Sequence, residues 1–564
     1  MKILYKKYGQ RAAVMISCLV LGQMLLQSCS KENTKGGFYS DEANINISVL
    51  GVSDKGDDGN MKLKASSAIR EAVKAPDQIQ GKLLNFNSFD AVVSLEKAAP
   101  TASRISIGRG ASSDKSNGLA AELVETGVTY RLFFYTEDGD FVTSAQLTSG
   151  TPGDITVPKG DNYNWYAVSY NDTEDIPAVD LENPSLALPA NKDVLYASGE
   201  LNIAADASDE TIALGIVFEH AFARIAIELN TMGMFADMES AVVEVSGNDA
   251  KTGTLNILTG TITDLTDATA TIDYSSFVDV DANYSDRKVA YFYTAAEDQL
   301  GALSVSLKGL SLAIDDGSTR SFTSLATSPS VFNFDITPQR GSSYTIRVDL
   351  VESPLTFDGV QWARQNLYYT GGHNPYRFHH TYAHTNNRNS YFSFQALTPN
   401  NFGIESDPCL EVYPAGTWRQ ASQDDYETLT GTPVLGGIGG VTGEQDVTYG
   451  TENGMGYFEY EVTTGTGAPY PGNNLRFNFN GSGISLGLVN GILELDLGST
   501  YGNSVRVWTS SKVLDIGILD LGAWSYGNQG TTEGRLYASV LQLGLLGAID
   551  VLESEFMNVR CVRN

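Results

Sequence analysis

Apolar and polar residues alternate along most of the chain between residues 44 and 351, where helical periodicity of useful length is scarce. Alternation with a period of two is typical of a half-buried β-strand. Gly, Asn, Asp and Pro separate the alternating segments, as expected of turns. The predicted strands are Asn44–Val52, Phe89–Leu95, Thr129–Tyr135, Phe141–Leu147, Ile155–Val157, Tyr163–Tyr170, Val194–Ile203, Ile212–Leu229 as one or two strands, and further segments that end near Val351. The pattern predicts a mainly β protein.

Two breaks in the strand pattern divide the chain. Asn171–Asn191 is rich in Pro, Asn and Asp, and Glu352–Ser353–Pro354 places a proline directly after a strand, where it stops pairing. We therefore expect β-sandwich subdomains at 29–190 and 191–353, followed by a further domain at 354–564. The stretch Ala98–Gly118 is predicted to be an exposed loop.

The first 28 residues have the pattern of an export leader. Four basic residues precede the apolar run AAVMISCLVLGQMLL, and Leu26-Gln27-Ser28-Cys29 resembles a lipobox. The resemblance implies cleavage before Cys29 and acylation of that residue, which would tether an outer-membrane lipoprotein at the cell surface without a membrane-spanning segment. An ordinary signal peptide or a transmembrane anchor is the alternative, although the apolar run is short for a span.

Composition limits the classes of partner. Hydrophobic residues make up 42% of the chain and aromatic residues 10%, so several cores can form. The formal net charge is −30, which repels nucleic acid. Nucleic-acid binding is therefore excluded, but the acidic balance identifies no partner by itself.

Five segments in the first two thirds resemble the fimbrillin family of Bacteroidetes surface lipoproteins. In order they are VTYRLFFYTEDGDFVTSAQLTSG, KGDNYNWYAVSYN, YASGELNI, FEHAFARIAIELN and FNFDITPQRGSSYTIRVDL, and the resemblance covers about residues 40–351. It implies two transthyretin-like β-sandwich subdomains and a protease cut after an arginine in an early loop. The first strand is then lost, and a strand from a neighbouring subunit fills its place by β-augmentation.

On this resemblance the removable strand is Asn44–Val52. The cut would follow Arg70, Arg104 or Arg109, and the sequence does not choose among them. The alternative is that the strand stays in place and that these arginines are ordinary surface charges.

The last third resembles the Fibrobacter succinogenes major paralogous domain, whose fold is similar to C-type lectins. The family motifs recur in order as Gly359-x-x-Trp362-x-x-x-Asn366-Leu367, then Cys409 with Pro414-Ala-Gly416-Thr-Trp418-Arg419, then Trp508-Thr-Ser, and finally VRCV at Val559–Val562. The resemblance implies a lectin-like α+β domain. An extra threonine precedes Trp418, and RQASQ replaces the more usual turn that follows it.

The chemistry-bearing residues of this domain allow structural and functional interpretations. Once the leader is removed, Cys409 has only Cys561 as a plausible disulfide partner, and export permits the bond. Trp362, Trp418 and Trp508 suit a core better than a sugar-stacking platform, because they are framework positions of the family. Trp524 lies outside the motifs and is a candidate exposed contact.

Four of the five histidines lie close together in GGHNPYRFHHTYAHTNNRNSYF. Their spacing matches no closed zinc pattern, and the carboxylate triplets of calcium-dependent lectins are absent from the sequence, so no metal or other cofactor is expected. We interpret the segment as a polar, aromatic exposed loop that could serve as a ligand-contact surface. The candidate contacts are His373, Tyr376, His379, His380, His384 and Trp524.

The sequence thus predicts a fimbrial tip subunit with a lectin-like adhesive head. A shaft subunit must donate its own C-terminal strand, and here a further domain occupies that end, so the protein would accept a strand and donate none. Its partners would be other pilin subunits, a host or bacterial surface glycan or protein, and the membrane through the lipid. The alternative is a non-polymerising outer-membrane lipoprotein that binds glycan or host protein. No catalytic motif supports an enzymatic function. A titratable cluster in a cleft of the last domain would favour one.

Overall fold

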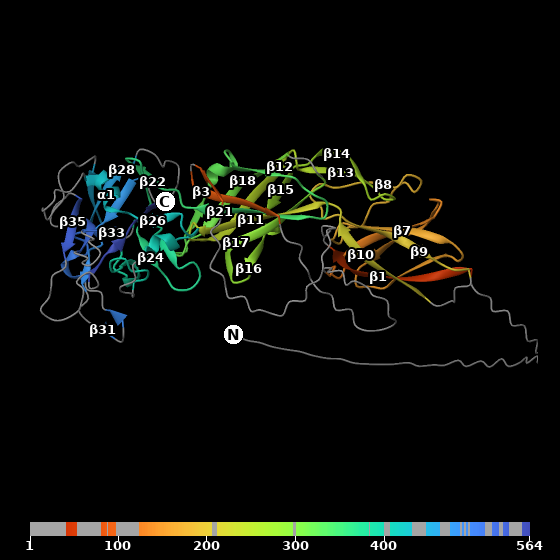
Figure 1. The fold of residues 1–564 in the computed structure, drawn as a ribbon, viewed down its shortest axis with the longest axis horizontal. Coiled ribbons are helices and arrows are strands. Elements are labelled where there is room, and N and C mark those ends of the chain that lie inside the picture. The colour runs from red at the N-terminus through yellow and green to blue at the C-terminus, as the bar shows by residue number, and fades with distance from the viewer. Residues whose placement is uncertain are drawn as a thin grey trace, which may run out of the picture.

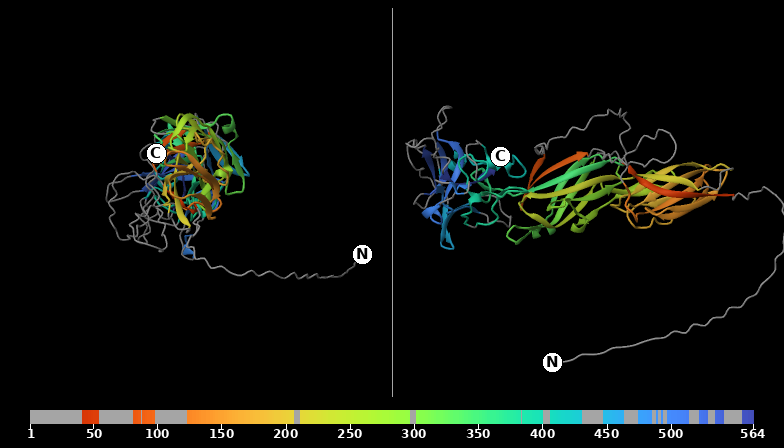
Figure 2. Two further views of the ribbon diagram at one scale, coloured as in Figure 1. Left: turned by 90° about the vertical axis from the view of Figure 1, so that its right-hand side faces the viewer. Right: turned by 90° about the horizontal axis from the view of Figure 1, so that it is seen from below.

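The computed structural model describes residues 41–53, 81–86, 88–97, 123–205, 211–296, 301–382, 384–399, 406–430, 447–462, 474–484, 488–489, 492–493, 497–513, 522–528, 534–540 and 555–564. They form a rod of three parts, with β1 in the part at one end and the C-terminal domain (residues 354–564) at the other (Figures 1 and 2). The leader, Cys29 and the three candidate cleavage arginines lie outside the described residues. Among the described residues, no helix is long and apolar enough to span a membrane.

The first unit is one seven-stranded sheet in the order β5-β4-β7-β9-β10-β1-β6. Six of its strands contribute to a single core, and β5 and β6, at opposite ends of the sheet, contact each other, so the sheet curls around that core. The strands are β1 (Glu42–Ser53), β4 (Thr129–Thr136), β5 (Phe141–Thr148), β6 (Gly153–Pro158), β7 (Asn162–Ser169), β9 (Leu195–Asn202) and β10 (Ile212–His220).

The second unit is a two-sheet sandwich. A six-stranded sheet, β16-β17-β11-β21-β3-β2, faces a five-stranded sheet in which β15, β12, β18 and β19 are neighbours and β20 also pairs with β18. The strands are β2 (Lys82–Asn85), β3 (Asp90–Lys97), β11 (Ala223–Gly233), β12 (Asp237–Gly247), β15 (Ala270–Asp273), β16 (Val278–Asp281), β17 (Tyr284–Thr294), β18 (Gly301–Ala313), β19 (Thr319–Ser321), β20 (Ser330–Ile336) and β21 (Ser343–Val351).

A small three-stranded sheet lies between the two units. It consists of β14 (Ile262–Asp267), β13 (Lys251–Asn256) and β8 (Ser185–Ala187). Leu186 of β8 and Leu255 of β13 share a hydrophobic cluster with Phe133 of the first unit. The two units are therefore packed together and not merely strung on a linker.

The boundary expected at residue 190 does not separate the two units. β9 and β10 follow it but belong to the first sheet, because β9 continues the antiparallel ladder of β7 over eight residue pairs. β3 precedes residue 190 but belongs to the second unit, where it pairs with β21 from Asp90↔Val351 to Lys97↔Tyr344. Such long-range pairing has no local signal in the sequence.

The C-terminal domain is built from short strands in several small sheets, and its described part contains one α-helix, α1 (Gln423–Thr430). Its sheets are β22-β23-β38-β26, β24-β25, β27-β28-β29, β30-β36, β31-β32 and β35-β34-β33-β37. The strands are β22 (Leu355–Phe357), β23 (Val360–Trp362), β24 (Leu367–Tyr369), β25 (Tyr376–Phe378), β26 (Trp418–Gln420), β27 (Val447–Glu452), β28 (Met455–Glu461), β29 (Asn474–Asn478), β30 (Gly483–Ile484), β31 (Leu488–Val489), β32 (Ile492–Leu493), β33 (Arg506–Lys512), β34 (Gly522–Gly527), β35 (Arg535–Val540), β36 (Glu555–Phe556), β37 (Asn558–Val559) and β38 (Cys561–Arg563).

Candidate functional sites

The β1 strand lies inside the first sheet with a partner on each side. It runs parallel to β10 and antiparallel to β6, so both rows of its backbone groups are paired. Its alternation is real: Ala43 is 3% exposed, and Ile45 and Ile47 are fully buried, while Asn44 and Ser48 face outward. The predicted strand Asn44–Val52 is thus confirmed as an integral part of the core.

The second half of β1 contains a bulge between Val49 and Gly51. The extra residue, Leu50, stays 43% exposed on the outer face of the sheet. It covers Gly215 of β10, where an added Cβ would lie 2.6 Å from the Leu50 Cδ1 atom. A bulge re-aims a side chain in this way, and any side chain at residue 215 would have to displace Leu50.

β3 is a structural strand of the second unit and also contacts the C-terminal domain. Phe89, Ala91 and Val93 belong to the core of the sandwich. The Asp90 carboxylate accepts a hydrogen bond of 2.6 Å from the guanidinium of Arg563, and both residues are buried. Burial raises the pKa of Asp90, against the opposing effect of the Arg563 charge.

A second buried carboxylate, Glu352, fixes the C-terminal domain to the second unit. Arg320 of β19 donates to both of its oxygens, at 2.9 and 3.3 Å, and Arg364 lies 3.4 Å away. The Glu352 backbone oxygen accepts from Arg563 at 2.8 Å. We call these residues and Asp90 the buried charge cluster; its five members are at most 8% exposed.

Tyr413 enters the same interface from the C-terminal domain. Its hydroxyl donates to Asp349 at 2.7 Å and accepts from Arg347 at 2.6 Å, while Asn230 donates to both Tyr413 and Asp349. Burial raises the pKa of Asp349, although Arg347 and its hydrogen bonds oppose the effect. Polar contacts therefore specify how the two parts dock, in addition to the apolar cluster that joins Val92 and Phe235 to Phe378.

The histidine segment is not the exposed loop that the sequence suggested, because it packs against the second unit. His373 stacks on Tyr284 with ring centroids 3.7 Å apart, and its Nε2 lies 2.7 Å from an Asp286 oxygen. His380 lies 3.0 Å from Asp316. Tyr376 is 8% exposed and belongs to the apolar cluster of the interface.

The other two histidines of the segment contact the C-terminal domain itself. His379 lies 2.9 Å from the Ser390 hydroxyl and stacks on Tyr368, and His384 donates to the Gly456 carbonyl at 2.9 Å. Among the described residues, no three His, Cys, Asp or Glu side chains are grouped so that they could hold a metal ion. The histidines of the segment therefore contact other parts of the protein.

Protonation of His379 is expected to make stability depend on pH. Burial, then the charges of His380 and Arg560, lowers the pKa of His379 to about 4, below its ordinary value of about 6.5. The unfolded chain then takes up the proton first as the pH falls, so stability is complete above pH 6.5 and is lost toward pH 4. His379→Gln should reduce the wild-type loss of unfolding free energy between pH 7 and pH 4.5 by up to about 3 kcal/mol.

The measurement is urea unfolding followed by tryptophan fluorescence, which reports mainly on the C-terminal domain because Trp362, Trp418, Trp508 and Trp524 lie there. Asn386→Gln, at an exposed position of the same segment, is the matched control and should keep the wild-type difference. Equal pH dependence in His379→Gln and wild type would contradict the assignment.

The tryptophans of the C-terminal domain are structural. Trp362, Trp418 and Trp508 are fully buried, as expected of framework positions. Trp524, predicted as an exposed contact, is only partly exposed and packs against the same core as Trp362. Trp362, Trp418 and Trp508 therefore offer no open sugar-stacking face.

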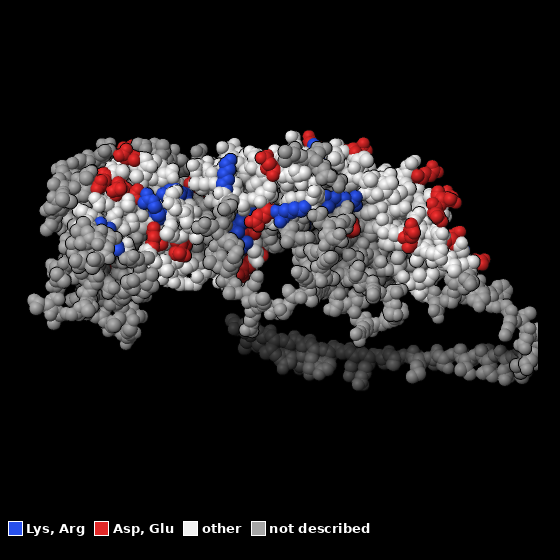
Figure 3. Space-filling model, viewed as in Figure 1, with Lys and Arg blue, Asp and Glu red and all other residues white. Residues whose placement is uncertain are grey.

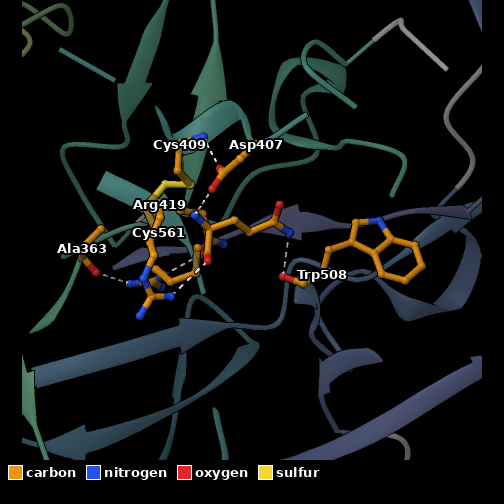
Figure 4. Close-up of a disulfide and its surroundings, with 9 residues drawn as sticks. Ala363, Asp407, Cys409, Arg419, Trp508 and Cys561 are labelled. Carbon is orange, nitrogen blue, oxygen red and sulfur yellow. Dashed lines mark hydrogen bonds between the residues drawn. A yellow bond between two sulfur atoms is a disulfide. The ribbon is translucent and has the colours of Figure 1, made fainter. Parts of the chain in front are cut away.

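Cys409 and Cys561 form a disulfide with a Cα–Cα distance of 5.7 Å across a sequence separation of 152 (Figure 4). The Asp407 carboxylate accepts hydrogen bonds from the backbone N–H groups of Cys409 and Gln420, both at 2.8 Å. Gln420 in turn donates to the Trp508 carbonyl at 3.2 Å. The disulfide and these hydrogen bonds together connect the segment around Cys409 with β26, β38 and β33.

The buried charge cluster was not predicted from the sequence. Asp90 and Glu352 stand at the ends of predicted strands, where a carboxylate is ordinarily solvated, and nothing local marks them as buried. A usable signal was Arg563 in VRCVR, because an arginine beside a cysteine in an apolar strand needs an acceptor from elsewhere in the chain.

Surface charge is uneven along the rod. On the face in Figure 3, acidic side chains predominate at the end formed by the first unit, while acidic and basic side chains both occur over the second unit and the C-terminal domain.

Comparison with known proteins matches residues 124–361 to the fimbrillin-like family Mfa_like_1. Similar solved structures include a candidate cell adhesion protein of Bacteroides fragilis, with 15% identity over 44% of this chain and 93% of that chain and a TM-score of 0.28. The fimbrial anchor protein Mfa2 of Porphyromonas gingivalis has 15% identity over 37% of this chain and 74% of that chain, with a TM-score of 0.22. A candidate adhesin of Bacteroides thetaiotaomicron has 13% identity over 34% and 70%, with a TM-score of 0.22.

No curated protein matches the chain. The family match ends at residue 361, so the lectin-like character of the C-terminal domain stays a prediction. The match includes β4–β7, β9 and β10 of the first unit, β8, β13 and β14 of the small sheet, and β11, β12 and β15–β21 of the second unit. Residues 124–361, less than half of the chain, are therefore similar to the fimbrillin-like family.

Proposed function

We propose that this protein is a fimbrial tip subunit and adhesin, which accepts a strand from a neighbouring subunit after its own β1 has been removed. The observation that carries the proposal is the position of β1 between β10 and β6. Its departure would leave two rows of unpaired backbone groups and the apolar pockets of Ala43, Ile45 and Ile47, the features that a donated strand fills. The fimbrillin-like match supports a structural, non-enzymatic role at the cell surface.

The positions of β1 and β3 favour Arg70 among the three candidate cleavage arginines. A cut after Arg70 would free β1 alone, because residue 70 precedes β2 and β3. A cut only after Arg104 or Arg109 would leave β1 covalently joined to β3, which lies in the other unit (Figure 2). Removing β3 would break its pairing with β21 and the Asp90–Arg563 bond.

The C-terminal segment of the sequence supports acceptance without donation. Cys561–Arg563 form β38, which lies between β23 and β26, and Cys561 is in the disulfide. Arg563 is also part of the buried charge cluster. Donating these residues to another subunit would dismantle the C-terminal domain, so residues 561–563 themselves are unsuited to serve as a donated strand.

The adhesive ligand of the C-terminal domain would be a surface glycan or protein, as the lectin-like resemblance implies. Tyr376 is buried, while the histidines and Trp524 are partly exposed and also contact other residues of the protein, so they offer only weak support for a contact surface. The lipid on Cys29, also proposed from the sequence, would hold the precursor at the outer membrane until the cut.

The test is N-terminal sequencing and intact-mass measurement of protein recovered from sheared cell-surface material. We expect a start directly after Arg70 in a fraction that contains other pilins. Arg70→Ala should leave β1 attached and keep the protein out of that fraction. The matched control is the double variant Arg104→Ala, Arg109→Ala, which should still be cut and incorporated.

A lipidated start at Cys29, found only with membranes in wild type, would contradict the tip proposal. It would instead favour the non-polymerising lipoprotein that binds glycan or host protein. A start after Arg104 or Arg109 would contradict the choice of Arg70 and leave strand removal standing.

A further inference from the structure

We infer that the groove vacated by β1 selects its donor by size and direction: the donor is a pilin strand that runs parallel to β10 and places a leucine-sized side chain over Gly215. This inference rests on the proposed function. The evidence is the fit of β1 itself, which is the strand now occupying the groove.

The inner face of the groove prescribes an alternating apolar pattern. Ala43 lies opposite Val157, Ile45 opposite Ile155 and Ile47 opposite Gly153 on β6. The smallest of the three β1 side chains thus faces a branched residue, while an isoleucine faces the position without a side chain. All three are buried, so a charged residue at any of them would be placed in the core without a partner.

The outer face adds two features that an ordinary apolar strand lacks. Asn46 donates a hydrogen bond of 3.1 Å to the Asp154 carboxylate on β6. Leu50 lies in the bulge and fills the space over Gly215, with its Cγ 3.1 Å and its Cδ1 2.6 Å from where a Cβ of residue 215 would be. A donor that reproduces these contacts needs a polar amide, then a bulky residue four positions later.

The direction of the donor follows from the two neighbouring strands. β1 meets β10 in a parallel ladder from Ile45↔Ile212 to Ser53↔Glu219 and meets β6 in an antiparallel ladder. A strand inserted in the opposite direction would run antiparallel to β10 and parallel to β6. Parallel and antiparallel ladders space their hydrogen bonds differently, so the backbone groups would no longer match. The reversed strand would also carry the bulge away from Gly215. Read along β10, the groove therefore fits the pattern small–polar–branched–Asn–branched–polar–apolar–Leu–Gly, as in Ala43–Gly51.

The experiment uses the chain without its leader, with a site-specific protease sequence at Arg70, cut in solution. Labelled peptides of residues 42–53 then compete for the groove, and their affinity is measured by fluorescence anisotropy. We expect the native peptide to bind and a peptide of reversed sequence to fail. In a Gly215→Ala protein the native peptide should bind about tenfold more weakly, because the added methyl meets Leu50.

The decisive result is the coupling between the two positions. A peptide carrying Leu50→Ala should bind wild-type and Gly215→Ala proteins with affinities within about threefold of each other, since the contact is gone from both. If Gly215→Ala does not fold, wild-type protein still discriminates: the Ile45→Asp and reversed peptides should be excluded while the native peptide enters.

The outcomes separate the two proposals. If the native peptide never enters the cut wild-type protein, strand exchange fails and the inference fails with it. If the native peptide enters but Leu50 and Gly215 show no coupling, or the reversed peptide binds equally well, strand exchange stands and only the inference on donor selection is overturned.

Discussion

Glu352→Gln should destabilise the docked C-terminal domain by about 3–5 kcal/mol, the range for removing one partner of a buried ion pair. Glu352 is 3% exposed and faces Arg320 and Arg364, both buried. Glutamine keeps the shape but removes the negative charge, so two guanidinium groups remain in the interface without their carboxylate. The measurement is urea unfolding by tryptophan fluorescence together with limited proteolysis near residue 353.

The matched control is Glu239→Gln, because Glu239 is exposed on β12. A change at such a surface position should stay within about 0.5 kcal/mol. If Glu352→Gln lowered the unfolding free energy by no more than Glu239→Gln does, the buried charge cluster would not be what holds the C-terminal domain in place.

Replacing Cys409 and Cys561 together by alanine should cost about 2–5 kcal/mol, since the closed loop spans a separation of 152 residues and restricts the unfolded chain strongly. Both cysteines are fully buried in the cluster that contains Trp418. The urea midpoint of the tryptophan transition should therefore fall. The wild-type protein should show a similar fall when a reducing agent is added.

The double-alanine variant is its own control for the reducing agent. With both cysteines gone, the reductant should leave its urea midpoint unchanged. A wild-type midpoint insensitive to reduction under conditions that break the bond would show that the disulfide contributes little to stability.

Local patterns in the sequence identified most strands of the first two units. Period-two alternation marked β1, β4, β5 and β7 to within two residues of their ends, since each buries one face. Short edge strands escaped notice: β2 and β16 are four residues each, and β16 is exposed throughout, so neither carries a clear pattern. Ile212–Leu229 was correctly seen as strand but is divided into β10 and β11, which lie in different units.

The arrangement of those strands and the role of the histidine segment could not be read from the sequence. β3 pairs with a strand far along the chain, and His373 contacts Asp286 and Tyr284, which belong to another unit. A polar and aromatic composition suits an exposed contact surface and a domain interface equally well. Which of the two the segment forms depends on the residues that it contacts, and those residues are distant in sequence.

The pairing of β3 also bears on the order in which the chain can fold. Asp90 and Arg563 are separated by 473 residues, and β3 is synthesised long before β21 and β38. Until β21 has been synthesised, β3 lacks its native neighbour on that side, and Phe89, Ala91 and Val93 remain without most of their core. Such non-local pairing slows folding and prolongs exposure of an aggregation-prone strand. The pairing of β3 with β21 can therefore form only once Ser343–Val351 have been made, and the Asp90–Arg563 contact only once the C-terminal domain is present.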